Sequence, residues 1–171
     1  MLDCLGREGR FRAPDSGVRE RAMGLLSDAE LRFLAACRVA HLATADRAGA
    51  PHVVPVCFIA EPDTVYITVD GKPKRAGAGR LKRLANIAEN PAVALVADRY
   101  DDDDWSRLGW IMVRGRAQVL ADGAEHDAAQ AALAARYRQY ATMRLDDLPV
   151  IAICIERVAC WGDLSVPAGA S

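Results

Sequence analysis

Three short apolar runs near the start of the chain, separated by tight turns, constrain the fold most strongly. RVAHLAT (38–44) and APHVVPVCFI (50–59) flank ADRAG, which holds the Asp and Gly of a hairpin loop. A second turn, Glu61-Pro62-Asp63, leads into the third run, TVYITV (64–69). Runs joined by turns this short favour antiparallel pairing between neighbours.

Later runs extend this pattern and set the fold class. AVALVA (92–97), WIMVRGRAQVL (110–120) and VIAICIERV (150–158) have the length and apolar content of strands. Strands therefore outnumber helices. The sequence predicts a mainly β (α+β) fold, an antiparallel sheet closed into a small barrel with helices packed outside.

Pro55 interrupts the second of the early runs. Proline has no N–H to donate within a central ladder, so it marks a sheet edge, a bulge or an opening in the strand. Backbone groups exposed at such a point are available to a ligand that approaches edge-on.

Two helices are predicted from their start and stop signals. Ser27 and Glu30 form a capping box, followed by an apolar stripe that predicts a helix ending near Arg38. A second helix is expected over residues 80–89, because the Asn-Pro pair ending at Pro91 stops it.

A third, alanine-rich helix is expected to follow the fifth run. Asp122 and Glu125 have the spacing of a cap, and apolar side chains then follow one face through about Tyr140. His126 falls in the first turn of this helix and is expected to be exposed.

Length and composition fit one globular domain. The chain has 171 residues, of which 51% are hydrophobic and 26% charged, so a sizeable core can form. Residues 1–26 are predicted to be a mobile arm with little regular structure, 27–162 the barrel domain, and 163–171 a polar tail.

Targeting and redox signals point to the cytoplasm. No run approaches the roughly 18 apolar residues of a membrane span, and the N-terminus lacks the apolar core of an export signal. The five cysteines form no C-x-x-C pair, which favours reduced thiols and argues against a structural metal.

The most unusual local composition lies between Lys72 and Arg83. These twelve residues carry six cations and no acid in a chain of net charge −1. Two glycines, Gly77 and Gly79, precede the helix-like run, and a helix N-terminus offers free N–H groups and a positive dipole end. The segment therefore predicts a phosphate site, with a solvated basic loop and helix face as the alternative.

Other candidate chemistries find little support. No Ser-His-Asp set, P-loop or G-x-G-x-x-G is present, and His41 and His52 have no evident acid–base partner. The run Asp101–Asp104 is expected to be a solvated loop, because four consecutive acids converge on a metal only through a sharp bend. Nucleic-acid binding is not expected, because no aromatic residue interleaves the basic segment.

The order of these motifs resembles the pyridoxamine 5′-phosphate oxidase-like superfamily of split β-barrel flavin and deazaflavin proteins, from about Glu30 to Trp161. The resemblance is carried in series by RVAHLAT, G-x-P-H-V-V-P-V (49–56), V-Y-I-T-V-D (65–70), R-L-A-N-I-x-x-N-P (83–91), D-D-W-S-R-L (103–108) and G-R-A (115–117). KPK followed by LKRLANIAENP and DRYDDDDWSRL is similar to an actinobacterial branch that depends on coenzyme F420.

The resemblance implies a set of cofactor-binding residues. Arg83 and Lys82 match positions that meet the cofactor phosphate, and Thr68 matches the end of the strand beside it. The strand segment 53–56 matches the backbone that lies along the ring system. The other cations of the basic segment join the set for their charge, and Trp105 joins it as a residue that could close over the ring, with core packing as the alternative. The whole predicted set is His52, Val53, Val54, Pro55, Val56, Thr68, Lys72, Lys74, Arg75, Arg80, Lys82, Arg83, Asn86 and Trp105.

The function that follows from the resemblance is that of a cytoplasmic, homodimeric oxidoreductase. It implies F420 bound between protomers and hydride transfer to or from an unknown small organic substrate, with no catalytic protein residue because the cofactor carries the chemistry. The alternatives are an FMN reductase or oxidase of the same fold, and a non-catalytic flavin or haem carrier. Pyridoxine chemistry is not expected, because the basic and histidine pattern it needs is not evident near the C-terminus.

Overall fold

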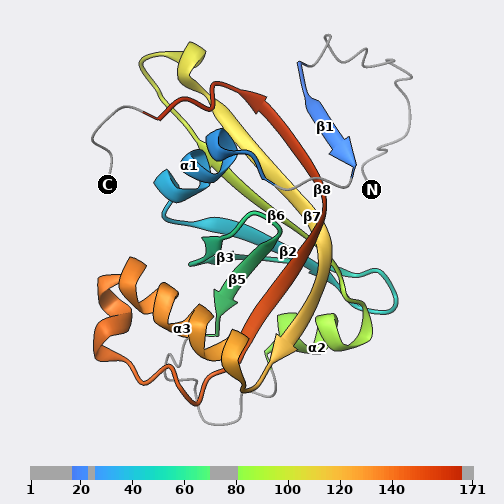
Figure 1. The fold of residues 1–171 in the computed structure, drawn as a ribbon. Coiled ribbons are helices and arrows are strands. Elements are labelled where there is room, and N and C mark those ends of the chain that lie inside the picture. The colour runs from blue at the N-terminus through green and yellow to red at the C-terminus, as the bar shows by residue number, and fades with distance from the viewer. Residues whose placement is uncertain (1–16, 23–25, 70–80, 167–171) are drawn as a thin grey trace, which may run out of the picture.

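An antiparallel sheet forms the body of the computed structural model, which describes residues 17–22, 26–69 and 81–166 (Figure 1). Seven strands follow one another in the order β3-β2-β6-β7-β8-β5-β4, and β1 pairs with the outer part of β8. Their bounds are β1 Arg19–Ala22, β2 Ala40–Ala45, β3 Pro51–Val56, β4 Ile59–Ala60, β5 Thr64–Thr68, β6 Ala92–Arg99, β7 Gly109–Leu120 and β8 Val150–Gly162.

The sheet curls because its two ends are tied together by the chain itself. Strands β3 and β4 lie at opposite ends of the ladder, yet only Cys57 and Phe58 separate them in sequence. Long strands β7 and β8 form the spine, and their register shifts beside Gly115. A Cβ there would lie 2.0 Å from the carbonyl oxygen of Cys154, so only glycine allows this approach. The predicted mainly β, antiparallel architecture is confirmed.

Three helices in the described part of the chain pack against the curled sheet. They are α1 (Asp28–Ala36), α2 (Lys82–Glu89) and α3 (Ala124–Arg136), with short 3-10 turns η1 (Trp105–Arg107) and η2 (Arg138–Thr142). Helix α3 packs on β4, β5 and β8, and α2 packs at the ends of β2 and β7 (Figure 1). Two apolar clusters result, one inside the curl and one between α3 and the sheet.

The start of α1 confirms the predicted capping box. The Ser27 N–H donates to Glu30 Oε2 at 2.7 Å, and the Glu30 N–H donates to Ser27 Oγ at 3.4 Å. The other end of α1 is held by Arg136, whose Nη2 donates to the carbonyl oxygens of Leu34, Ala35 and Cys37 at 3.1, 3.0 and 2.6 Å. One guanidinium thus satisfies three carbonyl groups that a helix end leaves without partners.

Two expectations about the third helix are corrected. Gly123, at a φ of +101°, is its N-cap in place of Asp122, and a left-handed φ suits glycine. Glu125 instead accepts a hydrogen bond from the Tyr66 hydroxyl at 3.1 Å. His126 is only 1% exposed, because the loop before β8 folds over its face of the helix.

Within the N-terminal region, where little regular structure is expected up to residue 26, the structure describes one short strand. Residues 19–22 form β1, which pairs antiparallel with Arg157 to Cys160 of β8. These four residues lack the apolar alternation by which a strand is recognised, and β8 supplies the free ladder edge that orders them. Among the described residues, no helix is both long enough and apolar enough to cross a membrane.

Candidate functional site

A cavity of about 190 Å³, hereafter the Arg83 cavity, lies where the ends of β3 and β5 meet the start of α2. Turn η2 and the residue before β2 complete its wall. The lining residues are Val39, Pro55, Val56, Cys57, Thr68, Arg83 and Tyr140. Five segments that are distant in the sequence therefore converge on one small space.

The curl of the sheet brings these residues together. Strand β3 begins the strand order, and Pro55 faces His41 of β2, so its other side is a sheet edge, which is the first of the three alternatives that this proline left open. Thr68 is the last residue of β5, opposite Val150. Arg83 lies in the first turn of α2, whose N-cap, Leu81, has no polar side chain to offer the free N–H groups.

Two polar atoms in this wall are buried without a partner among the described residues. They are Thr68 Oγ1 and Arg83 Nε. An unsatisfied buried polar group costs about 1–3 kcal/mol, and more where the group is charged. Both are hydrogen-bond donors, so the wall is suited to a ligand with anionic or acceptor oxygens.

Lys82 and Arg83 are neighbours in sequence but differ in their partners. Lys82 Nζ pairs with Asp46 Oδ2 at 3.0 Å, on the turn between β2 and β3, and is not part of the cavity lining. The hydrogen bond from Lys82 is the main reason that the pKa of Asp46 is lowered. Successive helix residues point about 100° apart, so one cation faces the turn and the other the cavity.

The remaining residues implied by the resemblance lie outside the cavity lining. His52, Val53 and Val54 belong to β3; Val53 is 58% exposed, and His52 Nδ1 is buried without a partner among the described residues. Asn86 is fully buried and donates to Thr44 Oγ1 at 3.0 Å, a contact that joins α2 to β2. Lys72, Lys74, Arg75 and Arg80 lie outside the described residues.

Trp105 is far from the Arg83 cavity within one chain. Helix α2 ends where β6 begins, and η1 follows the end of β6. An eight-residue strand spans about 26 Å, so Trp105 lies at the other end of the sheet and is 71% exposed. Any contact it makes with a ligand in this cavity has to come from a second copy of the chain.

The sequence did not predict three residues of the cavity wall, Val39, Cys57 and Tyr140. Their neighbour Tyr137 fixes them, because its hydroxyl accepts from the Phe58 N–H at 3.0 Å and contacts the Phe58 carbonyl oxygen at 2.8 Å. This contact holds the link from β3 to β4 against the end of α3. The only signal in the sequence is the pair of tyrosines three residues apart, which also fits ordinary core packing.

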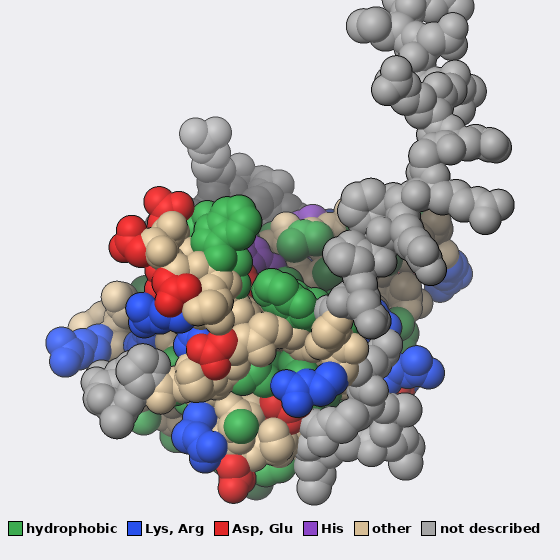
Figure 2. All heavy atoms as spheres, turned by 90° about the horizontal axis from the view of Figure 1, so that it is seen from above, with side chains coloured by type: hydrophobic (Ala, Val, Ile, Leu, Met, Phe, Trp, Pro, Cys, Tyr) green, Lys and Arg blue, Asp and Glu red, His purple; other side chains and the backbone are tan. Residues whose placement is uncertain are grey.

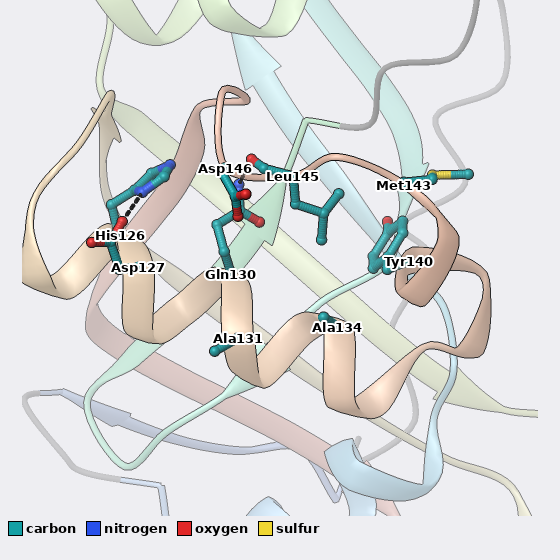
Figure 3. A pocket seen from close by; sticks show the side chains of 9 residues that line it. All are labelled: His126, Asp127, Gln130, Ala131, Ala134, Tyr140, Met143, Leu145 and Asp146. Carbon is teal, nitrogen blue, oxygen red and sulfur yellow. Dashed lines mark hydrogen bonds and ion pairs between the residues drawn. The ribbon is translucent and has the colours of Figure 1, made fainter.

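A second and larger cavity, the His126 cavity, lies between α3 and the loop before β8 (Figure 3). It measures about 470 Å³ and is lined by His126, Asp127, Gln130, Ala131, Ala134, Tyr140, Met143, Leu145 and Asp146. Figure 3 shows His126 at one end of the cavity and Tyr140 and Met143 at the other.

The donors at the His126 cavity are engaged with nearby acceptors, although the acceptor Gln130 Oε1 is buried without a partner among the described residues. His126 Nδ1 lies 2.9 Å from Asp127 Oδ1, and its Nε2 lies 2.9 Å from the Leu148 carbonyl oxygen. Gln130 Nε2 donates to the carbonyl oxygens of Leu145 and Leu148 at 2.9 and 2.8 Å. The hydrogen bond to Asp127, and then that to Leu148, raise the pKa of His126. These contacts attach the loop to α3.

Hydrogen bonds join residues within the acidic loop 101–104. Asp101 Oδ1 accepts from the N–H groups of Asp103 and Asp104 at 3.1 Å. Figure 2 shows acidic side chains gathered toward one side of the end of the molecule where α1 lies, beside exposed hydrophobic ones. Among the described residues, no group of three His, Cys, Asp or Glu side chains is placed to hold a metal ion.

The comparisons with known proteins agree with this architecture. A reductase of Streptomyces rimosus, 5a,11a-dehydrotetracycline/5a,11a-dehydrooxytetracycline reductase, is 32% identical over 94 residues. These residues are 55% of this chain and 63% of the relative, so the match spans less than two thirds of that protein.

Two solved structures share the fold. A FAD-binding protein from Mesorhizobium loti is 25% identical, with a TM-score of 0.58 over 84% of this chain and 96% of its own. A conserved hypothetical protein from Mycobacterium tuberculosis is 18% identical, with a TM-score of 0.63 over 90% of this chain and 99% of its own. Residues 26–162 match the pyridoxamine 5′-phosphate oxidase family, and the chain therefore belongs to that family of split β-barrel proteins.

Proposed function

We propose that this chain is an oxidoreductase that binds F420 with its phosphate in the Arg83 cavity and transfers a hydride between the deazaflavin and a small organic substrate. One observation carries the proposal: Arg83 Nε and Thr68 Oγ1 are buried donors without partners among the described residues, and both line the same cavity. A cofactor phosphate supplies the acceptors that these groups lack.

The relatives support the reaction class. The matched protein of Streptomyces rimosus is a reductase, and the structurally similar protein of Mesorhizobium loti binds FAD. Among the described residues that line the Arg83 cavity there is no Ser or His nucleophile, and the one thiol, that of Cys57, is half-buried. A chain with this wall suits chemistry that resides in a cofactor.

Each wall residue has a separate role in this proposal. Arg83 and Thr68 hold the phosphate, and the edge-strand backbone at Pro55 and Val56 orients the ring beside it. Val39 and Tyr140 cover the remaining apolar wall and exclude water. The bound cofactor supplies the hydride chemistry, and these residues bind and position it.

The choice of F420 over FMN rests on the sequence. FMN ends at one phosphate, whereas F420 continues into a tail that bears several carboxylates. Lys72, Lys74, Arg75 and Arg80 supply more positive charge than one phosphate needs, although they lie outside the described residues. Neutralising the first three together should weaken binding of long-tailed F420 more than that of its tail-less precursor, and the difference should shrink with salt.

A homodimer is part of the proposal. The outer face of the sheet carries Val53, Ala43 and Ala94 in one cross-strand row, and Val53 is 58% exposed. Exposed apolar side chains beside a cofactor cavity are characteristic of a subunit interface. Val53→Glu should shift the sedimentation coefficient from that of a dimer to that of a monomer at micromolar concentration; an unmodified protein that sediments as a monomer with cofactor bound would contradict the dimer.

The proposed function is tested by equilibrium titration of the purified protein with F420, FMN and haem, each followed by its visible or fluorescence spectrum. F420 is expected to bind most tightly. Tighter binding of FMN would mean that the cofactor is a flavin and not the deazaflavin. Tight binding of haem alone would favour a carrier over an oxidoreductase.

A further inference from the structure

A third cavity, the Arg38 cavity, adjoins the proposed cofactor site. It measures about 390 Å³, within the range of roughly 300–1,000 Å³ usual for small-molecule pockets. Val39, Cys57 and Tyr140 belong to the walls of both the Arg38 and the Arg83 cavities. The Arg38 cavity adds four residues of its own, Arg38, Tyr137, Gln139 and Met143. Ligands in the two cavities would therefore contact the same side chains.

One wall of the Arg38 cavity is aromatic and rigid. The rings of Tyr137 and Tyr140 lie with centroids 5.5 Å apart, tilted by 57°. Tyr137 is held by its hydrogen bonds to the backbone of Phe58 and is 4% exposed. Tyr140 is 6% exposed, and the Cζ atoms of Arg38 and Arg136 lie 4.7 and 5.4 Å from the Tyr137 ring centroid, so the rings present their edges to the cavity. Fixed aromatic edges favour an aromatic ligand, because ring pairs prefer edge-to-face contact and little side-chain freedom is lost on binding.

The charge on the described wall of the Arg38 cavity is positive. Among the residues that the structure describes, Arg38 is the only charged one that lines it, and no carboxylate does. Arg38 Nη2 donates to the Arg136 carbonyl oxygen at 2.7 Å, and its Cζ lies 4.7 Å from the Tyr137 ring centroid. A guanidinium has five N–H donors. Within the described part of the chain the others have no protein acceptor, and because Arg38 is exposed a ligand anion can reach them from solvent.

The neighbouring His126 cavity shows the opposite pattern. Two carboxylates, Asp127 and Asp146, line it together with His126. Tyr140 and Met143 stand between the two cavities, as members of both walls. An anion is therefore favoured on the Arg38 side of Tyr140 and disfavoured on the other.

We propose that the Arg38 cavity binds the organic substrate, and that this substrate is an aromatic anion whose carboxylate or enolate pairs with Arg38 while its ring system packs against the wall formed by Tyr137, Tyr140 and Met143. This inference rests on the proposed function, because it takes the adjoining Arg83 cavity as the cofactor site.

The test uses two non-reacting probes of the same shape, 2-naphthoate and its neutral amide, 2-naphthamide. Isothermal titration calorimetry measures the binding of each to the protein with and without F420, and a separate fluorescence titration measures F420 affinity. The unmodified protein is expected to bind 2-naphthoate about tenfold more tightly than 2-naphthamide, as one charge-assisted contact provides. Arg38→Gln should abolish that preference and leave F420 affinity unchanged.

Further variants separate charge from folding. Gln139→Glu adds a negative charge to the same wall at an exposed position and should weaken 2-naphthoate several-fold without affecting 2-naphthamide. Met143→Trp should fill the cavity and weaken both probes. Arg138→Gln removes an exposed arginine beside the cavity that does not line it, and should change nothing.

Three outcomes would overturn the proposal. Equal binding of the two probes would remove the anionic preference, and binding indifferent to Arg38, Gln139 and Met143 would remove the location. Competition between 2-naphthoate and F420 would make the cavity part of the cofactor site. If F420 fails to bind at all but Arg38-dependent binding of 2-naphthoate persists, the proposed cofactor fails and the anion site alone stands.

Discussion

The His126 cavity and the Arg83 cavity differ in size and in what their polar groups do. The His126 cavity is the larger, about 470 Å³ against about 190 Å³. Both nitrogens of His126 have acceptors within 2.9 Å. At the Arg83 cavity, Arg83 Nε and Thr68 Oγ1 have no partner among the described residues. Buried donors are thus used for folding in the His126 cavity, where only the acceptor Gln130 Oε1 is unmatched among the described residues, and left available in the Arg83 cavity.

The comparison shows that volume alone does not identify a ligand site. A cavity whose donors and acceptors satisfy each other contributes to stability and gains little by binding a polar ligand. A cavity with unmatched donors loses stability in the empty state, and that loss is recovered when a ligand binds. Substitutions at the two cavities should therefore affect different quantities.

The largest expected effect is on stability, at the His126 cavity. His126→Ala should lower the free energy of unfolding by about 2–4 kcal/mol, because it removes two part-buried hydrogen bonds and leaves a void where a buried ring was. Urea unfolding monitored by circular dichroism measures the loss. F420 affinity of the folded variant should match that of the unmodified protein; a large loss of affinity would mean that the two cavities are coupled.

The next prediction compares two threonines that are equally buried. Thr68 and Thr44 are each 4% exposed, but Thr44 Oγ1 accepts a hydrogen bond from Asn86, whereas Thr68 Oγ1 has no partner among the described residues. Thr68→Val should weaken F420 binding about 3–10-fold and leave the stability of the apo-protein unchanged or raised by up to about 1 kcal/mol.

Thr44→Val is the matched control. It should lower stability by about 1 kcal/mol or more, because the Asn86 amide loses its acceptor, and leave F420 affinity unchanged. If Thr68→Val lowers stability as Thr44→Val does, Thr68 is a structural residue and not a ligand contact.

The smallest effect is a pH dependence confined to the His126 cavity. Besides Asp127, the acids that face or surround His126 are Asp122 and Asp146. The pKa of His126 is raised in the folded protein, so its contribution is complete below the unfolded value of about 6.5 and is lost as pH rises through the folded value. Urea unfolding at pH 6 and pH 8.5 should show a lower free energy of unfolding at the higher pH in the unmodified protein but not in His126→Gln. If the free energy of unfolding falls equally in both proteins, the pH dependence belongs to another group.

The sequence predicts the fold better than it predicts the site. The capping box at Ser27 and the edge position of Pro55 follow from local chemistry, so they could be recognised without coordinates. Burial of His126 could not, because it depends on a loop that begins more than fifteen residues later and folds back over α3.

The sequence likewise predicts some residues of the candidate site and misses others. Arg83 and Thr68 come from motifs that occur in order along the chain, whereas Val39 and Tyr140 reach the cavity only through the curl of the sheet and the end of α3. The sequence also gives Lys82 and Arg83 equal weight. Only the structure shows that Asp46 engages Lys82 and that Arg83 faces the cavity.

The most direct test of the central claim is a pair of F420 titrations at low salt, with Arg83→Ala and Lys82→Ala measured beside the unmodified protein. Arg83→Ala should weaken F420 binding by roughly ten- to a hundredfold, because a charge-assisted contact is worth about 1.5–3 kcal/mol. Lys82→Ala removes an exposed pair with Asp46 and should change affinity by less than about threefold. Equal losses in the two folded variants, or no loss in Arg83→Ala, would contradict the assignment of the Arg83 cavity as the phosphate site.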